Sequence, residues 1–237
     1  MEKKNQIIKY LKSSREEMIN LQRLLTSIPA VSPESGGSGE LSKAKALEGW
    51  LKEKGFENIK WYNARDKKAE GGIRPNMVVE IPGKKHERRF WIMSHIDVVP
   101  PGELSLWETD PFRLEVKGDK IFGRGVEDNQ QGLTASVFAA LSLISNSITP
   151  EYDVSLLFVA DEEMGSQYGI KYLLDNYNLF GENDFVLVPD SGDPDGKLIE
   201  IAEKNVLWLK VTTKGKQCHA SRPDLGRNAF AASSEMV

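Results

Sequence analysis

The sequence has a single cysteine, Cys218, and no long apolar run among its 237 residues. One cysteine excludes an internal disulfide framework and is typical of a reducing compartment. No apolar stretch approaches the roughly 18 residues of a membrane span, and the charged segment 1–12 lacks the apolar core of a signal peptide. We therefore expect a cytoplasmic protein without a membrane segment.

The sequence also lacks a strong excess of charge of either sign. It has 31 basic and 35 acidic residues, which are interspersed and give a net charge of −4. Such a chain offers no extended basic face for a nucleic-acid backbone, so nucleic acid is excluded as an expected partner. A hydrophobic content of 40% over this length suffices for one large domain, or for one domain and part of another.

The spacing of apolar residues predicts an α/β fold. Helical periodicity predicts an amphipathic helix over residues 5–28 and a second helix that ends at Gly55. Short apolar runs predict buried strands at 77–81, 90–93, 154–160 and 185–188, and further helices are expected near 129–145 and 167–176. This alternation is typical of a mixed, largely parallel sheet flanked by helices.

The character of the sequence changes after Glu203. Apolar residues alternate over 206–211 as in a strand, and 228–237 has the pattern of a helix start without a capping glycine. We therefore expect a first domain over 1–203 and the beginning of a second domain over 204–237. The uncapped end leads us to expect that the chain is the first part of a longer protein.

Acidic residues and a histidine follow the predicted strands, at the edge where open α/β sheets bind ligands. His95 and Asp97 come after the run 90–93, and their spacing allows Asp97 to accept a hydrogen bond from the second ring nitrogen of His95. Asp128 opens the helix near 129–145, after a glycine-rich loop. Because that loop lacks the lysine of a phosphate-binding loop, nucleotide binding is a weak alternative.

Two more acidic groups follow the later strands. Asp161, Glu162 and Glu163 come directly after the run 154–160, and Asp190 follows the run 185–188. Three consecutive carboxylates repel one another unless solvent or cations neutralise them, and a dinuclear metal site would do so. One histidine and several carboxylates suit zinc, cobalt or manganese.

Five motifs in this order resemble those of the family that contains acetylornithine deacetylase, succinyl-diaminopimelate desuccinylase, aminoacylase and glutamate carboxypeptidase. They lie at residues 94–100, at Trp107 with 110–112, at 123–125 with Asp128, at 161–166 and at 190–192. The resemblance spans nearly the whole chain and implies a zinc-exopeptidase-like catalytic domain followed by an α+β lid domain. It implies two divalent metals, of which zinc is the first expectation and cobalt or manganese the alternatives.

The resemblance also implies roles for individual residues. His95 and Asp190 would hold one metal, Glu163 the other, and Asp128 would bridge the two. Asp97 would orient His95, and Glu162 would be the general base. The family's last ligand, a histidine far downstream, has no counterpart in the chain, so we expect this chain alone to be inactive or nearly so.

A further motif around Cys218 and His219 resembles part of the family's lid domain. There the histidine stabilises the reacting carbonyl oxygen, often across a dimer interface, so the resemblance implies that His219 is catalytic and that the protein is a homodimer. Gln131 departs from the family's usual lysine. Cys218 is not expected to be a nucleophile, because adjacent residues of an extended chain point to opposite faces.

The implied activity is metal-dependent hydrolysis of an amide bond in an N-acyl amino acid or a small peptide, with Glu162 accepting the proton of the attacking water. A non-catalytic binding module that keeps the fold is the alternative, and the absent last ligand is its support. A metal-dependent phosphoesterase uses the same ligand types. It is disfavoured because no arginine or lysine clamp for a phosphate accompanies the acidic clusters.

Overall fold

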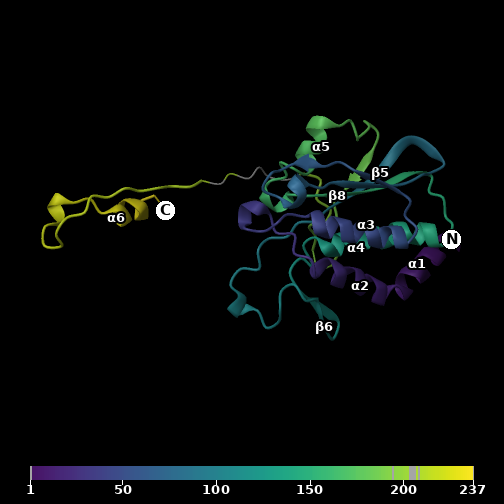
Figure 1. The fold of residues 1–237 in the computed structure, drawn as a ribbon, viewed down its shortest axis with the longest axis horizontal. Coiled ribbons are helices and arrows are strands. Elements are labelled where there is room, and N and C mark those ends of the chain that lie inside the picture. Colours follow the sequence, from purple (N-terminus) through teal and green to yellow (C-terminus); the bar gives the residue numbers. More distant parts are fainter. Residues whose placement is uncertain (1, 194, 203–206, 208, 237) are drawn as a thin grey trace. The chain divides into compact units, whose positions relative to one another are not determined.

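The computed structural model describes residues 2–193, 195–202, 207 and 209–236 (Figure 1). By internal contacts the chain divides into two compact units, Met1–Pro194 and Asp195–Val237. No helix in the described part of the chain is both long enough and apolar enough to cross a membrane. The two units are described separately below.

The first unit is built on a five-stranded mixed sheet, which confirms the predicted α/β class. The strand order is β1-β4-β8-β5-β9. β5 pairs in parallel with β8 and β9, whereas β4 pairs antiparallel with β1 and β8. The bounds of these strands are β1 Asn58–Trp61, β4 Met77–Ile81, β5 Lys85–His95, β8 Tyr152–Val159 and β9 Phe185–Leu187.

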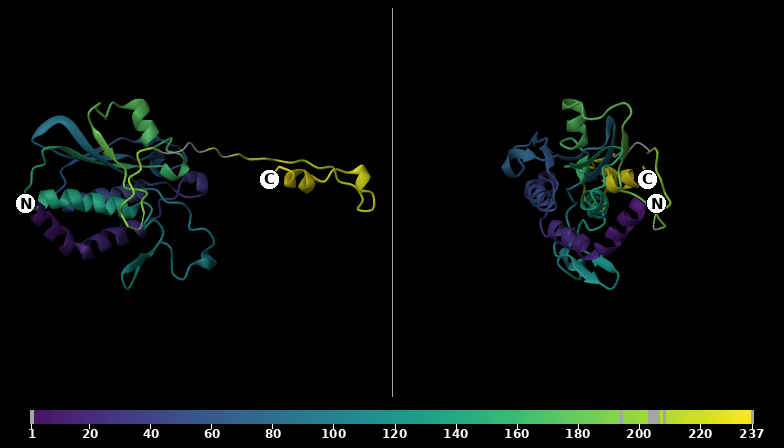
Figure 2. Two further views of the ribbon diagram at one scale, coloured as in Figure 1. Left: turned by 180° about the vertical axis from the view of Figure 1, so that it is seen from behind. Right: turned by 90° about the vertical axis from the view of Figure 1, so that its right-hand side faces the viewer.

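Helices cover both faces of this sheet, as Figure 1 and the reverse view in Figure 2 show. On one face, a large apolar cluster joins the sheet to four helices: α1 Glu2–Ser13, α2 Arg15–Thr26, α3 Leu41–Glu53 and α4 Gln130–Ser145. On the other face, a smaller cluster around Trp91 includes Leu173 of α5, Ile170–Asn176. Because successive strand residues point to opposite faces, strands buried on both sides have the continuous apolar runs seen in the sequence.

The predicted single helix over 5–28 is wrong, because two helices occupy this segment. The break falls at Ser14, which is buried and lies between α1 and α2. Its hydroxyl donates to the carbonyl oxygen of Tyr10 at 2.8 Å. Serine hydroxyls that bond locally to the backbone often bend or interrupt a helix, and apolar periodicity does not detect this effect.

Two small hairpins lie outside the main sheet. β2, Ala64–Arg65, pairs antiparallel with β3, Ile73–Arg74, and β6, Glu115–Lys117, pairs antiparallel with β7, Lys120–Phe122. The first hairpin is important for the site, because it carries the fully buried Arg74.

The second unit contains the short helix α6, Ala229–Ser234. The side chain of Asn228 caps it by accepting hydrogen bonds from the backbone N–H groups of Phe230 and Ala231. The strand predicted at 206–211 falls partly on Val206 and Trp208, which lie outside the described residues. Its described members, 207 and 209–211, are not in a strand. The role of this unit as a lid or dimerisation domain stays a prediction.

Candidate metal centre

Three parallel strands end at one edge of the sheet, and their ends carry the acidic groups. His95 is the last residue of β5 and pairs with Val159, the last residue of β8. Asp161, Glu162 and Glu163 follow β8, and Asp190 follows β9. Parallel pairing therefore explains why groups that are far apart in the sequence meet at this edge.

The imidazole of His95 lies at the centre of the group and is buried. Its Nε2 atom is 2.8 Å from Oδ1 of Asp128 and 3.7 Å from Oδ1 of Asp190. Oε2 of Glu162 lies 4.0 Å from the same nitrogen.

The structure thus brings the four predicted ligands together with Glu162. Two sets of donor atoms each lie within 4.8 Å of one another, His95 with Glu162 and Asp190, and His95 with Asp128 and Glu163. Glu162 belongs to one set and Glu163 to the other, so these distances do not separate a ligand from a general base.

Asp97 lies on the opposite side of the His95 ring and is buried. Its carbonyl oxygen is 3.0 Å from Nδ1 of His95, and its Oδ1 is 3.4 Å from the same nitrogen. Its carboxylate accepts hydrogen bonds from the backbone N–H groups of Glu162 and Glu163, each at 3.1 Å. Asp97 therefore links the end of β5 to the turn that carries both glutamates.

Asn129, which directly precedes α4, holds Asp190 in place. Nδ2 of Asn129 donates to Oδ1 of Asp190 at 2.6 Å and to the carbonyl oxygen of Pro189 at 3.1 Å. Gly132 permits this approach, because a Cβ atom there would lie 1.9 Å from the same carbonyl oxygen. The peptide bond between Asp128 and Asn129 is cis.

Burial and mutual repulsion perturb the ionisation of these groups. Burial, together with the nearby charge of Asp128, raises the pKa of Glu163 to about 7. Burial also raises the pKa of Glu162. For His95, burial alone would lower the pKa, but the nearby carboxylates of Asp190 and Asp97 outweigh it and raise the pKa to about 11.

This donor set fits divalent metal ions. The donor group places four carboxylates beside one imidazole, and the protein by itself keeps a proton on His95 at neutral pH and one on Glu163 below about pH 7. A cation that replaces those protons relieves the repulsion, and the combination of carboxylate oxygen with imidazole nitrogen suits zinc, cobalt or manganese.

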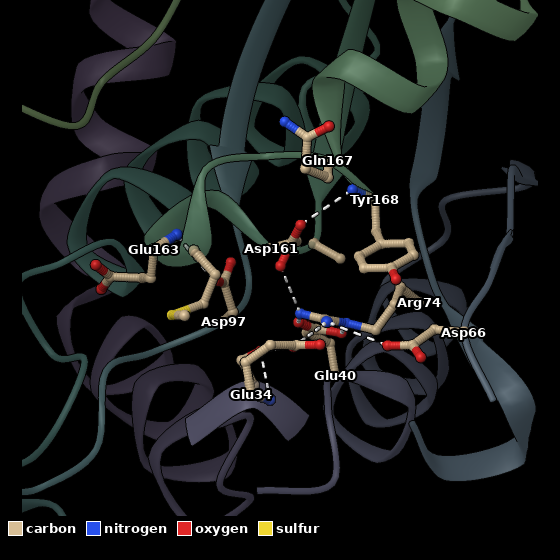
Figure 3. Close-up of polar contacts among 12 residues, drawn as sticks. Glu34, Glu40, Asp66, Arg74, Asp97, Asp161, Glu163, Gln167 and Tyr168 are labelled. Carbon is tan, nitrogen blue, oxygen red and sulfur yellow. Dashed lines mark hydrogen bonds and ion pairs between the residues drawn. The ribbon is translucent and has the colours of Figure 1, made fainter. Parts of the chain in front are cut away.

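Asp161 is the acidic residue of its run that does not join the donor group. It has a left-handed backbone conformation, with φ of 66°, and its side chain points toward Arg74 (Figure 3). The contacts that Arg74, Asn129 and Asp161 make around the donor group were not predicted. Asn129 could have been found from its place directly after Asp128, but Arg74 lies between Gly72 and Pro75 in no recognisable motif.

His219 belongs to the second unit and is exposed. The backbone N–H of Ser221 donates to its Nδ1 atom at 3.2 Å. It is not a member of either donor set found among the described residues. Its catalytic role stays a prediction.

The chain is similar in sequence to known metallohydrolases. Residues 91–232 match the model of peptidase family M20/M25/M40. The chain is 44% identical over 222 residues to an uncharacterised metallohydrolase of Methanocaldococcus jannaschii, covering 90% of this chain and 53% of the relative. It is 31% identical over 216 residues to a succinyl-diaminopimelate desuccinylase of Dinoroseobacter shibae, with the same coverage of 90% and 53%.

The fold also resembles a solved structure. An M20 family metallo-carboxypeptidase from Sulfolobus solfataricus superposes with a TM-score of 0.61 at 28% identity, covering 76% of this chain and 39% of that one. The chain thus spans about half the length of the curated relatives it matches.

Proposed function

The chain belongs to peptidase family M20/M25/M40, a family of metallohydrolases, and we propose that the protein to which it contributes hydrolyses amide bonds with two divalent metals. The convergence of His95 with Asp128, Glu162, Glu163 and Asp190 at one edge of the sheet carries this proposal. The substrate would be an N-acyl amino acid or a small peptide.

His95 and Asp190 would hold one metal and Glu163 the other, with Asp128 between the two. When bound, the metals would lower the pKa of a water molecule and polarise the amide carbonyl. Zinc fits this donor set, and cobalt or manganese are the alternatives. This assignment is supported by the carboxylates of Asp128 and Asp190, which both lie near Nε2 of His95.

Glu162 would be the general base. Its side chain is 46% exposed, so a substrate and a water molecule can reach it, and burial of its inner part raises its pKa. A raised pKa suits a group that must take up a proton near neutral pH and give it away again. Glu162 would accept the proton of the attacking water as the new C–O bond forms, and would pass it to the amine nitrogen as the C–N bond breaks.

Asp97 would orient these groups, because it contacts His95 and the backbone of both glutamates. His219 of the second unit would stabilise the developing charge on the carbonyl oxygen, in a homodimer formed through that unit. The sequence motif around Cys218 and His219 supports this part of the proposal.

The test is hydrolysis of a panel of N-acyl amino acids and dipeptides by the full-length protein, before and after chelation and metal return. Glu162→Gln should abolish turnover by orders of magnitude with metal content near wild type, because a general base is not a ligand. Glu163→Gln, the matched neighbour, should lose metal.

Three outcomes would contradict the proposal. Equal metal loss in the two variants would show that the two roles are wrongly divided. Turnover that survives complete metal removal would exclude the mechanism. Metal binding by the full-length protein without hydrolysis of any amide in the panel would favour a binding module.

A further inference from the structure

A buried guanidinium, that of Arg74, lies on the far side of Asp161 from Glu163 (Figure 3). Arg74 is fully buried, and its side chain contacts four carboxylates. Nε and Nη2 donate to the two oxygens of Glu40, which is also fully buried. Nη1 lies 3.4 Å from Glu34 and 3.5 Å from Asp66, so the planar guanidinium is fixed from several directions.

The fourth carboxylate belongs to Asp161, which begins the turn at the end of β8. Its Oδ1 accepts from Nη2 of Arg74 at 3.1 Å, and its Oδ2 accepts from the backbone N–H of Tyr168 at 3.0 Å. The ring of Tyr168 lies 5.3 Å from the Arg74 guanidinium. Both carboxylate oxygens of Asp161 are therefore held, and its side chain cannot turn toward the donor group.

The conformation of Asp161 determines where the next two residues lie. Its left-handed backbone reverses the chain, so that the N–H groups of Glu162 and Glu163 both point at Asp97. Aspartate adopts this conformation more readily than most residues, because its short polar side chain can form hydrogen bonds nearby. Arg74 holds the Asp161 carboxylate on one side of the turn, and the carboxylate of Asp97 binds the turn backbone on the other.

A stabilising role alone does not account for this arrangement. Buried ion pairs contribute little net stability, because the cost of removing charges from water offsets their attraction. Four carboxylates share this guanidinium, and burial raises the pKa of Glu40 and of Asp161. What the network does provide is a fixed direction for Asp161.

We propose that Arg74 is a positioning residue of the metal centre, which acts through Asp161 to fix the turn that presents Glu162 and Glu163. This inference rests on the proposed metal-binding function of those glutamates. Arg74→Lys keeps the charge but loses the planar fork, so it cannot bind Glu40 and Asp161 together. Asp161→Asn keeps an acceptor for the Tyr168 N–H but removes the ion pair.

The experiment uses the full-length protein loaded with cobalt(II), whose visible spectrum reports the ligand geometry. Wild type, Arg74→Lys and Asp161→Asn are compared by that spectrum, by cobalt affinity and by the separate values of kcat and KM. Arg89→Lys is the matched control. Arg89 lies in β5, away from the turn, and pairs with Glu80 of β4 at 2.9 Å and with Asp153 of β8 at 3.5 Å.

Both test variants should show an altered cobalt spectrum, a metal affinity lower by on the order of 10- to 100-fold and a lower kcat, since groups that support metal ligands have effects of this size. Arg89→Lys should retain the wild-type spectrum. If Arg74→Lys does not fold, Asp161→Asn decides the question alone. A wild-type spectrum and affinity in the folded variants would overturn the positioning role, whereas absence of cobalt binding by the wild type would overturn the metal centre and the inference with it.

Discussion

Gly132 offers a test of how closely α4 must approach the loop after β9. It is the third residue of α4, and the Pro189 carbonyl oxygen lies where its Cβ atom would be. In Gly132→Ala the new Cβ would be 1.9 Å from that oxygen and 3.1 Å from Nδ2 of Asn129. The loop meets this atom with backbone, which cannot rotate away as a side chain can.

The size of the effect follows from these distances. Real Cβ contacts are essentially never shorter than 3.0 Å, so the loop or the helix must move by about 1 Å. Asp190 directly follows Pro189 and takes a 2.6 Å hydrogen bond from Asn129, so the displacement reaches the donor group. Metal sites tolerate deviations of about 0.2 Å, and we expect zinc affinity to fall by about 10- to 100-fold. Overpacking should also cost about 1–3 kcal/mol of stability.

The assay is calorimetric zinc titration of the full-length protein, with thermal unfolding of the metal-free form. Gly49→Ala is the control, because Gly49 lies in α3 with nothing within 4 Å of its would-be Cβ. That substitution should stabilise the protein by up to about 1 kcal/mol, the helix-propensity difference, with zinc affinity unchanged. Equal zinc affinity in Gly132→Ala, Gly49→Ala and wild type would refute the reasoning.

Three other measurements test the site and the core. Zinc affinity should fall as the pH is lowered from about 8 to about 6, because zinc must displace a proton from His95, with a pKa of about 11, and increasingly also from Glu163, with a pKa of about 7. Calorimetric titration at each pH measures this, and an affinity independent of pH would contradict it. Asn129→Ala should weaken zinc binding by about tenfold or more in the same titration, since Asp190 loses its 2.6 Å donor. Phe138→Ala, at a fully buried position, should lower the free energy of unfolding by about 3–5 kcal/mol in denaturant titration with zinc affinity retained.

The sheet and the donor group were accessible from the sequence because both depend on local patterns. The run at 77–81 coincides with β4, and the runs at 90–93 and 154–160 fall on β5 and β8. A strand buried on both faces needs an unbroken apolar run, and a polar residue directly after it lies at the strand end. His95 and Asp190 were found in this way.

The contacts that hold the donor group in place could not be predicted from the sequence, because they join distant segments of the chain. Arg74 lies 34 residues from Glu40 and 87 residues from Asp161 along the chain. Nothing in the sequence around Arg74 distinguishes a buried arginine from a solvated one, since periodicity reports apolar faces only. The break between α1 and α2 was missed for a related reason, because it is marked by serine hydroxyls bonded to the Tyr10 carbonyl oxygen and not by a change in the apolar pattern.

The run of three carboxylates after β8 shows what the missing contacts change. The sequence predicted repulsion among Asp161, Glu162 and Glu163 that metal ions would resolve. In the structure the backbone at Asp161 turns its carboxylate toward Arg74, while the two glutamates lie beside His95. Part of the repulsion is therefore relieved by the protein itself, before any metal binds.

This separation has a chemical consequence. With Asp161 bonded to Arg74 and to the N–H of Tyr168, both of its oxygens are engaged, which leaves Glu162 and Glu163 as the carboxylates of this run that face the imidazole. Each of these glutamates belongs to one of the two donor sets around His95. Arg74 thus limits the donor group to them, since a freed Asp161 would add a third carboxylate of this run beside the imidazole.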